Sequence, residues 1–150
     1  MKELRGSART SVPATPERCV ELFEAVEDYP SWYPEVVQEV NVLEREDDGR
    51  PSRVRAKLHV AKGPITKDFD LVLAVISDRR TEIKLTRVKH PGSGDEEFEA
   101  TWHVVDAAGA EISLDLLASL DVPRFLPVGG IGDAMADGFV SAATRALASS

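Results

Sequence analysis

Cysteine is almost missing from this sequence of 150 residues, since Cys19 is the only one. A single cysteine excludes an internal disulfide framework and any zinc cluster built on several cysteines, and it fits a reducing cytoplasm. Long apolar runs are missing too. The longest stretch without a charge, 125–132, holds eight residues with one proline and three glycines, too short to cross ~30 Å of hydrocarbon. The polar start MKELRGSART has no apolar signal-peptide core, so we expect a cytoplasmic protein without stable membrane insertion.

Basic residues are in deficit. Lys and Arg total 18 against 26 Asp and Glu, which gives a formal net charge of −8. Nucleic acid and anionic membranes would on average repel such a chain, so we expect neither as a partner. Hydrophobic residues make up 43% of the sequence, and no linker or repeat divides the chain. We therefore expect one domain over residues 1–150, whose core needs neither metal nor disulfide.

The hydrophobic periodicity changes twice along the chain. Residues 3–12 are typical of a strand, and Thr15 as N-cap before Pro16 predicts a helix over about 16–26. Two prolines in YPSWYP then allow at most a short turn of helix. After Pro123 the pattern is helical again, with one apolar stripe over 128–146. Between them the period is two, and short connections predict an antiparallel meander of strands at 36–45, 52–61, 67–77, 81–89, 96–106 and 110–121.

The alternation gives the predicted sheet one apolar face and one polar face. In the second strand of the meander, Val54, Ala56, Leu58 and Val60 alternate with Arg53, Arg55, Lys57 and His59. A wide twisted sheet with one long helix to cover it tends to wrap around that helix. Because the helix stripe is rich in small residues, we expect unfilled space between sheet and helix, which is a candidate ligand cavity.

Three segments in this setting resemble a known family: VPATPERCVELF at 12–23, VEDYPSWYPEV at 26–36 and GFVSAA at 138–143. The chain is similar to the START-like, helix-grip superfamily, and within it to the polyketide cyclase/dehydrase and lipid-transport group, which includes coenzyme Q-binding proteins. The resemblance implies an α+β helix-grip fold, in which a seven-stranded antiparallel sheet wraps around a long C-terminal helix and two short helices follow strand 1. It also implies an apolar cavity for a lipid, quinone, steroid or aromatic polyketide.

Candidate ligand-binding residues lie at the expected cavity mouth, on the apolar sheet face and on the final helix. Trp32 and Tyr33 stand between two prolines, where amphipathic aromatic side chains would suit an entrance, although Trp32 is about equally suited to plug the core. In a hollow fold the same side chains form the core and the cavity wall. The inward candidates are Phe69, Leu71, Leu85, Phe98 and Trp102 on the strands, with Met135 and Phe139 on the final helix.

Arg87 is the polar candidate. Alternation in TEIKLTRVK places it on the side of Ile83 and Leu85, where a guanidinium needs a carboxylate or a ligand oxygen. If the strand ends at this point, Arg87 would instead lie in solvent at the cavity rim. Pointing inward, it would orient an acidic or carbonyl-bearing ligand.

Neither a metal site nor a cofactor is expected. His59 and His103 fall on the polar face with no acidic residue at a matched position, and His90 falls in a turn, which does not fit zinc or iron ligation. Gly129 and Gly130 precede a helix as in a phosphate-binding loop, but no strand leads directly into them and no Lys, Ser or Thr ends the motif.

These patterns predict a protein that binds or transports a hydrophobic small molecule, as a monomer or weak homodimer. Two other functions stay open. One is a cyclase or dehydrase acting on an enclosed aromatic or polyketide substrate, in which Arg87 would stabilise an enolate-like oxygen; aromatase/cyclase members usually carry a polar, arginine-containing motif on a central strand, whereas the stretch 56–73 has apolar inward positions. The other is a protein-interaction module that uses a sheet edge or segment 29–34. No catalytic residue can be named.

Overall fold

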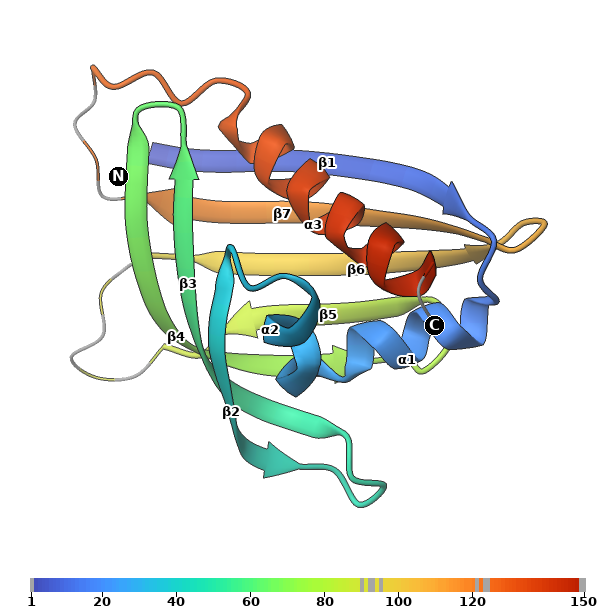
Figure 1. Cartoon of the computed structure of the whole chain (residues 1–150). Coiled ribbons are helices and arrows are strands. Elements are labelled where there is room, and N and C mark those ends of the chain that lie inside the picture. Colours follow the sequence, from blue (N-terminus) through green and yellow to red (C-terminus); the bar gives the residue numbers. More distant parts are fainter. Residues whose placement is uncertain are drawn as a thin grey trace.

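A computed structural model describes residues 2–89, 91, 94, 96–120, 122 and 125–148. It confirms the predicted seven-stranded antiparallel sheet, the long C-terminal helix and the two short helices after the first strand (Figure 1). The elements follow in the order β1 (Lys2–Val12), α1 (Pro16–Glu24), a 3₁₀ turn η1 (Val26–Asp28), α2 (Tyr29–Trp32), β2 (Val37–Arg45), β3 (Pro51–Lys62), β4 (Ile65–Ser77), β5 (Glu82–Arg87), β6 (Phe98–Asp106), β7 (Ala110–Leu120) and α3 (Ile131–Ala148).

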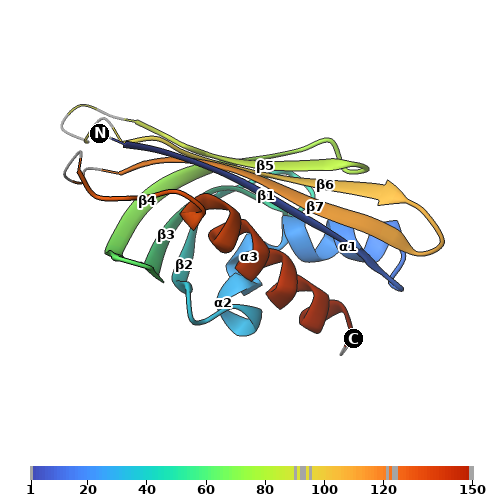
Figure 2. The same ribbon diagram turned by 90° about the horizontal axis from the view of Figure 1, so that it is seen from above.

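The sheet is strongly curved, and α3 lies against its concave side (Figure 2). The strand order is β1-β7-β6-β5-β4-β3-β2, so the first two strands of the chain form the two edges. The predicted apolar face is the buried one: Val54, Ala56, Leu58 and Val60 on β3 are all at most 6% exposed. Burial of this face against α1 and α3 creates the core.

Cross-strand ion pairs cover the convex face. Lys57 lies 3.1 Å from Glu39, and Lys84 lies 2.9 Å from Glu99. These contacts are exposed and are worth ~1 kcal/mol or less each. They agree with the interpretation of this face as solvated.

The histidines on the convex face do have acidic neighbours, so that part of the sequence analysis was wrong. His59 stands directly opposite Asp68 in the β3–β4 register, with 2.6 Å between Nδ1 and Oδ1. His103 Nε2 lies 3.1 Å from Asp115. Nevertheless, the described residues contain no group of three or more His, Cys, Asp or Glu arranged to hold a metal ion. His90 lies outside the described residues.

The start of α1 follows from its sequence. Thr15 Oγ1 accepts a hydrogen bond from the Arg18 backbone N–H at 3.2 Å, and Pro16 occupies the first turn, where its missing N–H costs nothing. The helix ends at Glu24, two residues earlier than predicted, and the chain continues as η1. Near the end of α1, Phe23 stacks on Trp102 of β6, with ring centroids 3.9 Å apart.

Helix α3 crosses the β1 edge with its backbone in direct contact. A Cβ atom added to Gly6 would overlap the backbone of Gly132, and one added to Gly132 would overlap the Arg5 carbonyl. Next to this crossing, the Ser7 N–H donates to Asp133 Oδ1 at 3.0 Å. The small residues of α3 therefore serve close packing, whereas the sequence analysis had linked them to unfilled space.

The other edge, β2, is irregular. Its register with β3 shifts between Val37 and Glu39, and twice more between Val42 and Arg45. Such bulges bend a strand and increase its twist.

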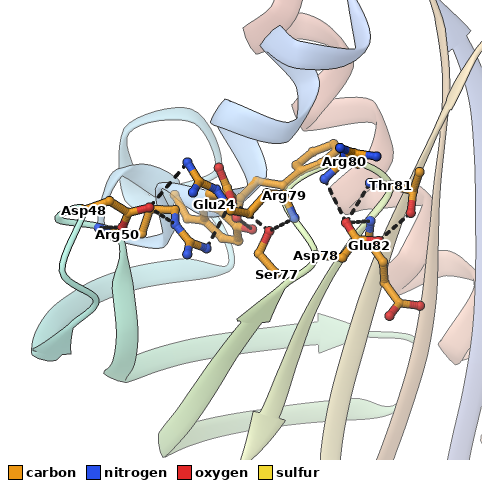
Figure 3. Close-up of polar contacts among 11 residues, drawn as sticks. Glu24, Asp48, Arg50, Ser77, Asp78, Arg79, Arg80, Thr81 and Glu82 are labelled. Atoms are coloured by element: carbon orange, nitrogen blue, oxygen red, sulfur yellow. Dashed lines mark hydrogen bonds and ion pairs between the residues drawn. The ribbon is translucent and has the colours of Figure 1, made fainter.

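A polar network ties the β2–β3 hairpin to α1 and to the β4–β5 turn (Figure 3). The Glu24 carboxylate accepts from Ser77 Oγ at 2.7 Å and from Arg50 Nη1 at 3.3 Å, while Arg50 Nε donates to Asp48 at 2.7 Å. Because Ser77 ends β4 and Ile65 begins it, this network lies at the opposite end of β4 from the β3–β4 hairpin. It links this end of the sheet to α1.

Candidate functional site

Among the described residues, two neighbouring spaces between the sheet and the helices share Phe139 in their walls. The first, the interior cavity, has a volume of only about 30 Å³ and an almost wholly apolar wall that includes Val26, Tyr29, Leu85, Phe98, Trp102 and Phe139. That volume is far below the roughly 300–1,000 Å³ of typical small-molecule sites. The core side chains therefore fill most of the space that the sequence analysis expected to find empty.

The second space, the mouth pocket, is open to solvent and has a volume of about 440 Å³. It lies between α3, the segment after α2 and the end of β3. Its apolar wall comes from Val36, Val60, Met135 and Phe139, and its polar groups from Tyr33, Glu35, His59, Lys62, Ser141 and Arg145. Phe139 lines both spaces, so its ring forms part of the wall between them.

An aromatic row runs from the mouth into the core. The Tyr33 and Phe139 ring centroids lie 4.8 Å apart in an edge-to-face arrangement, and those of Phe139 and Trp102 lie 6.4 Å apart. The missing side chain at Gly138 leaves room for Tyr33, because a Cβ atom there would overlap the tyrosine hydroxyl. The ring of Tyr33 thus rests directly on α3 beside Phe139.

The one hydroxyl in the interior wall is committed to the protein. Tyr29 Oη donates to the Phe23 carbonyl at 2.7 Å and accepts from the Trp102 side chain. Burial raises the pKa of Tyr29 far above its ordinary value, and the Trp102 hydrogen bond opposes this only in part. Tyr29 is therefore neutral at every physiological pH and offers no proton-transfer group to the interior.

Titratable groups gather at the mouth instead. Burial raises the pKa of Tyr33, with a smaller contribution from the Glu35 carboxylate, while Arg145 opposes the shift. His59 faces Asp68. The formally charged side chains among the described residues of the mouth pocket are Lys62, Arg145 and Glu35.

The predicted site residues separate into groups. Leu85, Phe98, Trp102 and Phe139 line the interior cavity, and Tyr33, Met135 and Phe139 line the mouth pocket. Phe69 and Leu71 are buried on the same sheet face but line neither space. Trp32 is half-buried beside Tyr29, and its indole N–H is a buried donor without a hydrogen-bond partner among the described residues.

Arg87 lies at the end of β5, on the same side of the strand as Ile83 and Leu85, as the alternation predicted. It is half-buried, and its Nη1 donates to the Glu96 carbonyl. It lines neither the interior cavity nor the mouth pocket. The guanidinium is thus already hydrogen-bonded to a main-chain oxygen of this protein.

Lys62 is one of the mouth-pocket residues that the sequence analysis did not name as a site residue. It ends the row of inward residues on β3, two positions after Val60, and it lines the mouth pocket. The same alternation that singled out Arg87 applied here, but the predicted strand ended at residue 61. A boundary error of one residue was enough to hide it.

A seven-stranded antiparallel sheet gripping a C-terminal helix, with two short helices after β1, defines a START-like, helix-grip protein. A START superfamily protein from Mycobacterium smegmatis has this fold, with a TM-score of 0.74 and 18% identity over 97% of this chain and 98% of its own. A protein from Thermus thermophilus aligns with a TM-score of 0.65 and 19% identity over 99% and 98%. For the major latex-like protein 151 of Panax ginseng the values are 0.62 and 13%, over 98% and 97%.

Residues 12–148 match the family described as polyketide cyclase/dehydrase and lipid transport. The chain belongs to that family, as the resemblance implied. No curated protein sequence matches it significantly. Among the described residues, no helix is long and apolar enough to span a membrane.

Proposed function

We propose that this protein binds a hydrophobic small molecule that enters through the mouth pocket and extends into the interior by displacing Phe139. The observation that carries the proposal is the position of this one side chain in the walls of both spaces. The family to which the chain belongs includes lipid-transport proteins, which supports the same class of ligand.

The two volumes determine how a ligand would be held. An interior of about 30 Å³ admits no lipid, whereas the mouth pocket of about 440 Å³ falls within the range of small-molecule sites. Rotation of Phe139 toward the mouth would join the two. Each Å² of ligand surface then removed from water contributes ~25 cal/mol, which favours a ligand long enough to reach the Trp102 ring.

A carrier or binding role is better supported than cyclase or dehydrase chemistry. An enclosed reaction needs an acid, a base or an oxyanion donor at the substrate. Among its described residues, the interior wall contributes only the Tyr29 hydroxyl, which is already hydrogen-bonded. The Arg87 guanidinium is held by the Glu96 carbonyl.

A titration with the neutral fluorescent probe N-phenyl-1-naphthylamine tests the proposal. We expect saturable binding, with a blue-shifted emission that displacement by long-chain alcohols or quinones reverses. Phe139→Leu shortens the side chain between the two spaces, and it should change probe affinity several-fold. Ile76→Ala, at a side chain that is 61% exposed on the convex face, should leave affinity unchanged and is the matched control. Absence of saturable binding to the folded wild-type protein would contradict the proposal.

A further inference from the structure

Lys62 occupies an unusual position for a lysine. On β3 it continues the inward row of Val54, Ala56, Leu58 and Val60, so its side chain leaves the strand on the concave side. There it joins Met135 and Phe139 in the wall of the mouth pocket. An ammonium group beside apolar walls loses part of its hydration and gains from an anionic or hydrogen-bonding partner.

The described chain supplies no such partner to Lys62, although it supplies one to every other lysine. The contrast is complete among the described residues, because each of the remaining lysines reaches an oxygen: Lys2 the Leu126 carbonyl, Lys57 Glu39, Lys67 Glu96, Lys84 Glu99 and Lys89 Glu97. Arg87, the other inward cation at a strand end, is likewise satisfied by the Glu96 carbonyl. Lys62 therefore presents an uncompensated positive charge to the pocket.

The charge of Lys62 also suggests the kind of head group. Lys62 brings to the pocket wall one positive charge without a partner among the described residues, on a chain whose formal net charge is −8. A single unpaired positive charge matches a carboxylate better than a phosphate, which carries up to two negative charges at neutral pH.

We propose that the ligand is an amphiphile with a single carboxylate head group, which Lys62 holds at the mouth while the apolar tail extends past Phe139. The inference rests on the proposed function and adds the class of ligand to it. Lys62 acts as a specificity-determining residue, because a neutral ligand of equal length would leave its positive charge uncompensated.

The test compares laurate with 1-dodecanol, which share a twelve-carbon chain and differ in head-group charge, as competitors of N-phenyl-1-naphthylamine. With wild-type protein we expect laurate to bind about tenfold more tightly at low salt, as for a charge-assisted hydrogen bond. The preference should shrink as ionic strength rises. Lys62→Met keeps the length of the side chain and removes its charge, and it should abolish the preference while dodecanol affinity stays within about twofold.

Lys57→Met is the matched control, since Lys57 lies on the same strand but on the convex face, paired with Glu39. It should keep the preference for laurate, and circular dichroism should show unchanged folding for both variants. Equal affinities for laurate and dodecanol in the wild type, or an equal loss of both in Lys62→Met, would overturn the carboxylate assignment and leave the proposed function standing. If neither compound displaces the probe and the probe itself fails to bind, both proposals are refuted.

Discussion

At the scale of single residues, the contact between Tyr33 and Gly138 sets the shape of the mouth pocket. Gly138→Ala places a methyl group in the space of the tyrosine hydroxyl. Ala favours a helix by ~1 kcal/mol over Gly, but an overlap of this kind costs ~1–3 kcal/mol. We therefore expect Gly138→Ala alone to lower the free energy of unfolding and to displace Tyr33, as measured by urea denaturation and probe binding.

Tyr33→Phe provides the control for this prediction. Without the hydroxyl, a Cβ atom at position 138 would meet Tyr33 Cζ at 3.4 Å, which is an ordinary contact. The double variant Tyr33→Phe, Gly138→Ala should recover or exceed wild-type stability, with a coupling free energy of ~1–3 kcal/mol between the two positions. Strictly additive effects would show that the hydroxyl does not rest on this glycine.

Whether a single side chain could be placed from the sequence depended on where its strand was predicted to end. Alternation placed Arg87 on the side of Ile83 and Leu85, and the register pairs it with Leu73. No pattern in the sequence could show that the Glu96 carbonyl would reach it across the β5–β6 connection. Lys62 was missed for the converse reason, because β3 extends one residue beyond the predicted boundary. A sequence alone therefore leaves two positions open for a cation at a strand end, the inward side of the sheet or the solvent, because the end of the strand is not known to the residue.

At the scale of elements, the seating of α3 on β1 depends on two glycines in backbone contact. Gly6→Ala and Gly132→Ala each introduce a Cβ atom that overlaps main-chain atoms, which cannot move aside as a flexible side chain can. We expect each variant to lose ~3 kcal/mol or more, or to fail to fold, as judged by thermal denaturation. Gly129→Ala, where no atom lies within 4 Å of the added Cβ, should remain within ~0.5 kcal/mol of wild type. Wild-type stability of both core variants would contradict the described crossing.

The elements themselves were predictable because local chemistry determines them. The Thr15 cap, Pro16 and the period-two pattern depend on neighbours in sequence, and the structure places α1 and the meander where they indicated. The interior was not predictable in the same way. Ala136, Ala142 and Ala143 are fully buried and allow α3 to approach the sheet closely, whereas the sequence alone could not distinguish close approach from a void.

At the scale of the whole molecule, carboxylates with partners in the folded state determine how acid acts on stability. Asp78 accepts hydrogen bonds from the backbone N–H groups of Arg80, Thr81 and Glu82, and these with the Thr81 hydroxyl hold its pKa well below the ordinary value of 3.8. A hydrogen bond from Arg55 lowers the pKa of Asp70 in the same direction. The folded state therefore binds these protons less readily than the unfolded chain does.

The sign follows from linkage. A depressed carboxyl pKa stabilises the folded state at pH values above about 4, and the contribution is lost as the pH falls below that value. We expect the urea midpoint to fall between pH 6 and pH 3. Asp78→Asn should lower stability at pH 6 by ~1 kcal/mol or less, because solvent screens this exposed group, and should weaken the pH dependence. Asp47→Asn, at an exposed hairpin position, should retain the wild-type pH profile; an unchanged profile in Asp78→Asn would contradict the assignment.

The two edge strands, β1 and β2, determine whether another copy of this chain could add a strand to the sheet. An unpaired edge strand is a template on which another chain can add a strand, which is a common route to aggregation. On β1 the Ser7 N–H already donates a hydrogen bond to the Asp133 side chain. On β2, register shifts and the charged residues Glu39 and Glu44 interrupt the regular ladder that a further strand would need. Both borders of this open sheet are thus poor templates for the addition of a strand from another chain.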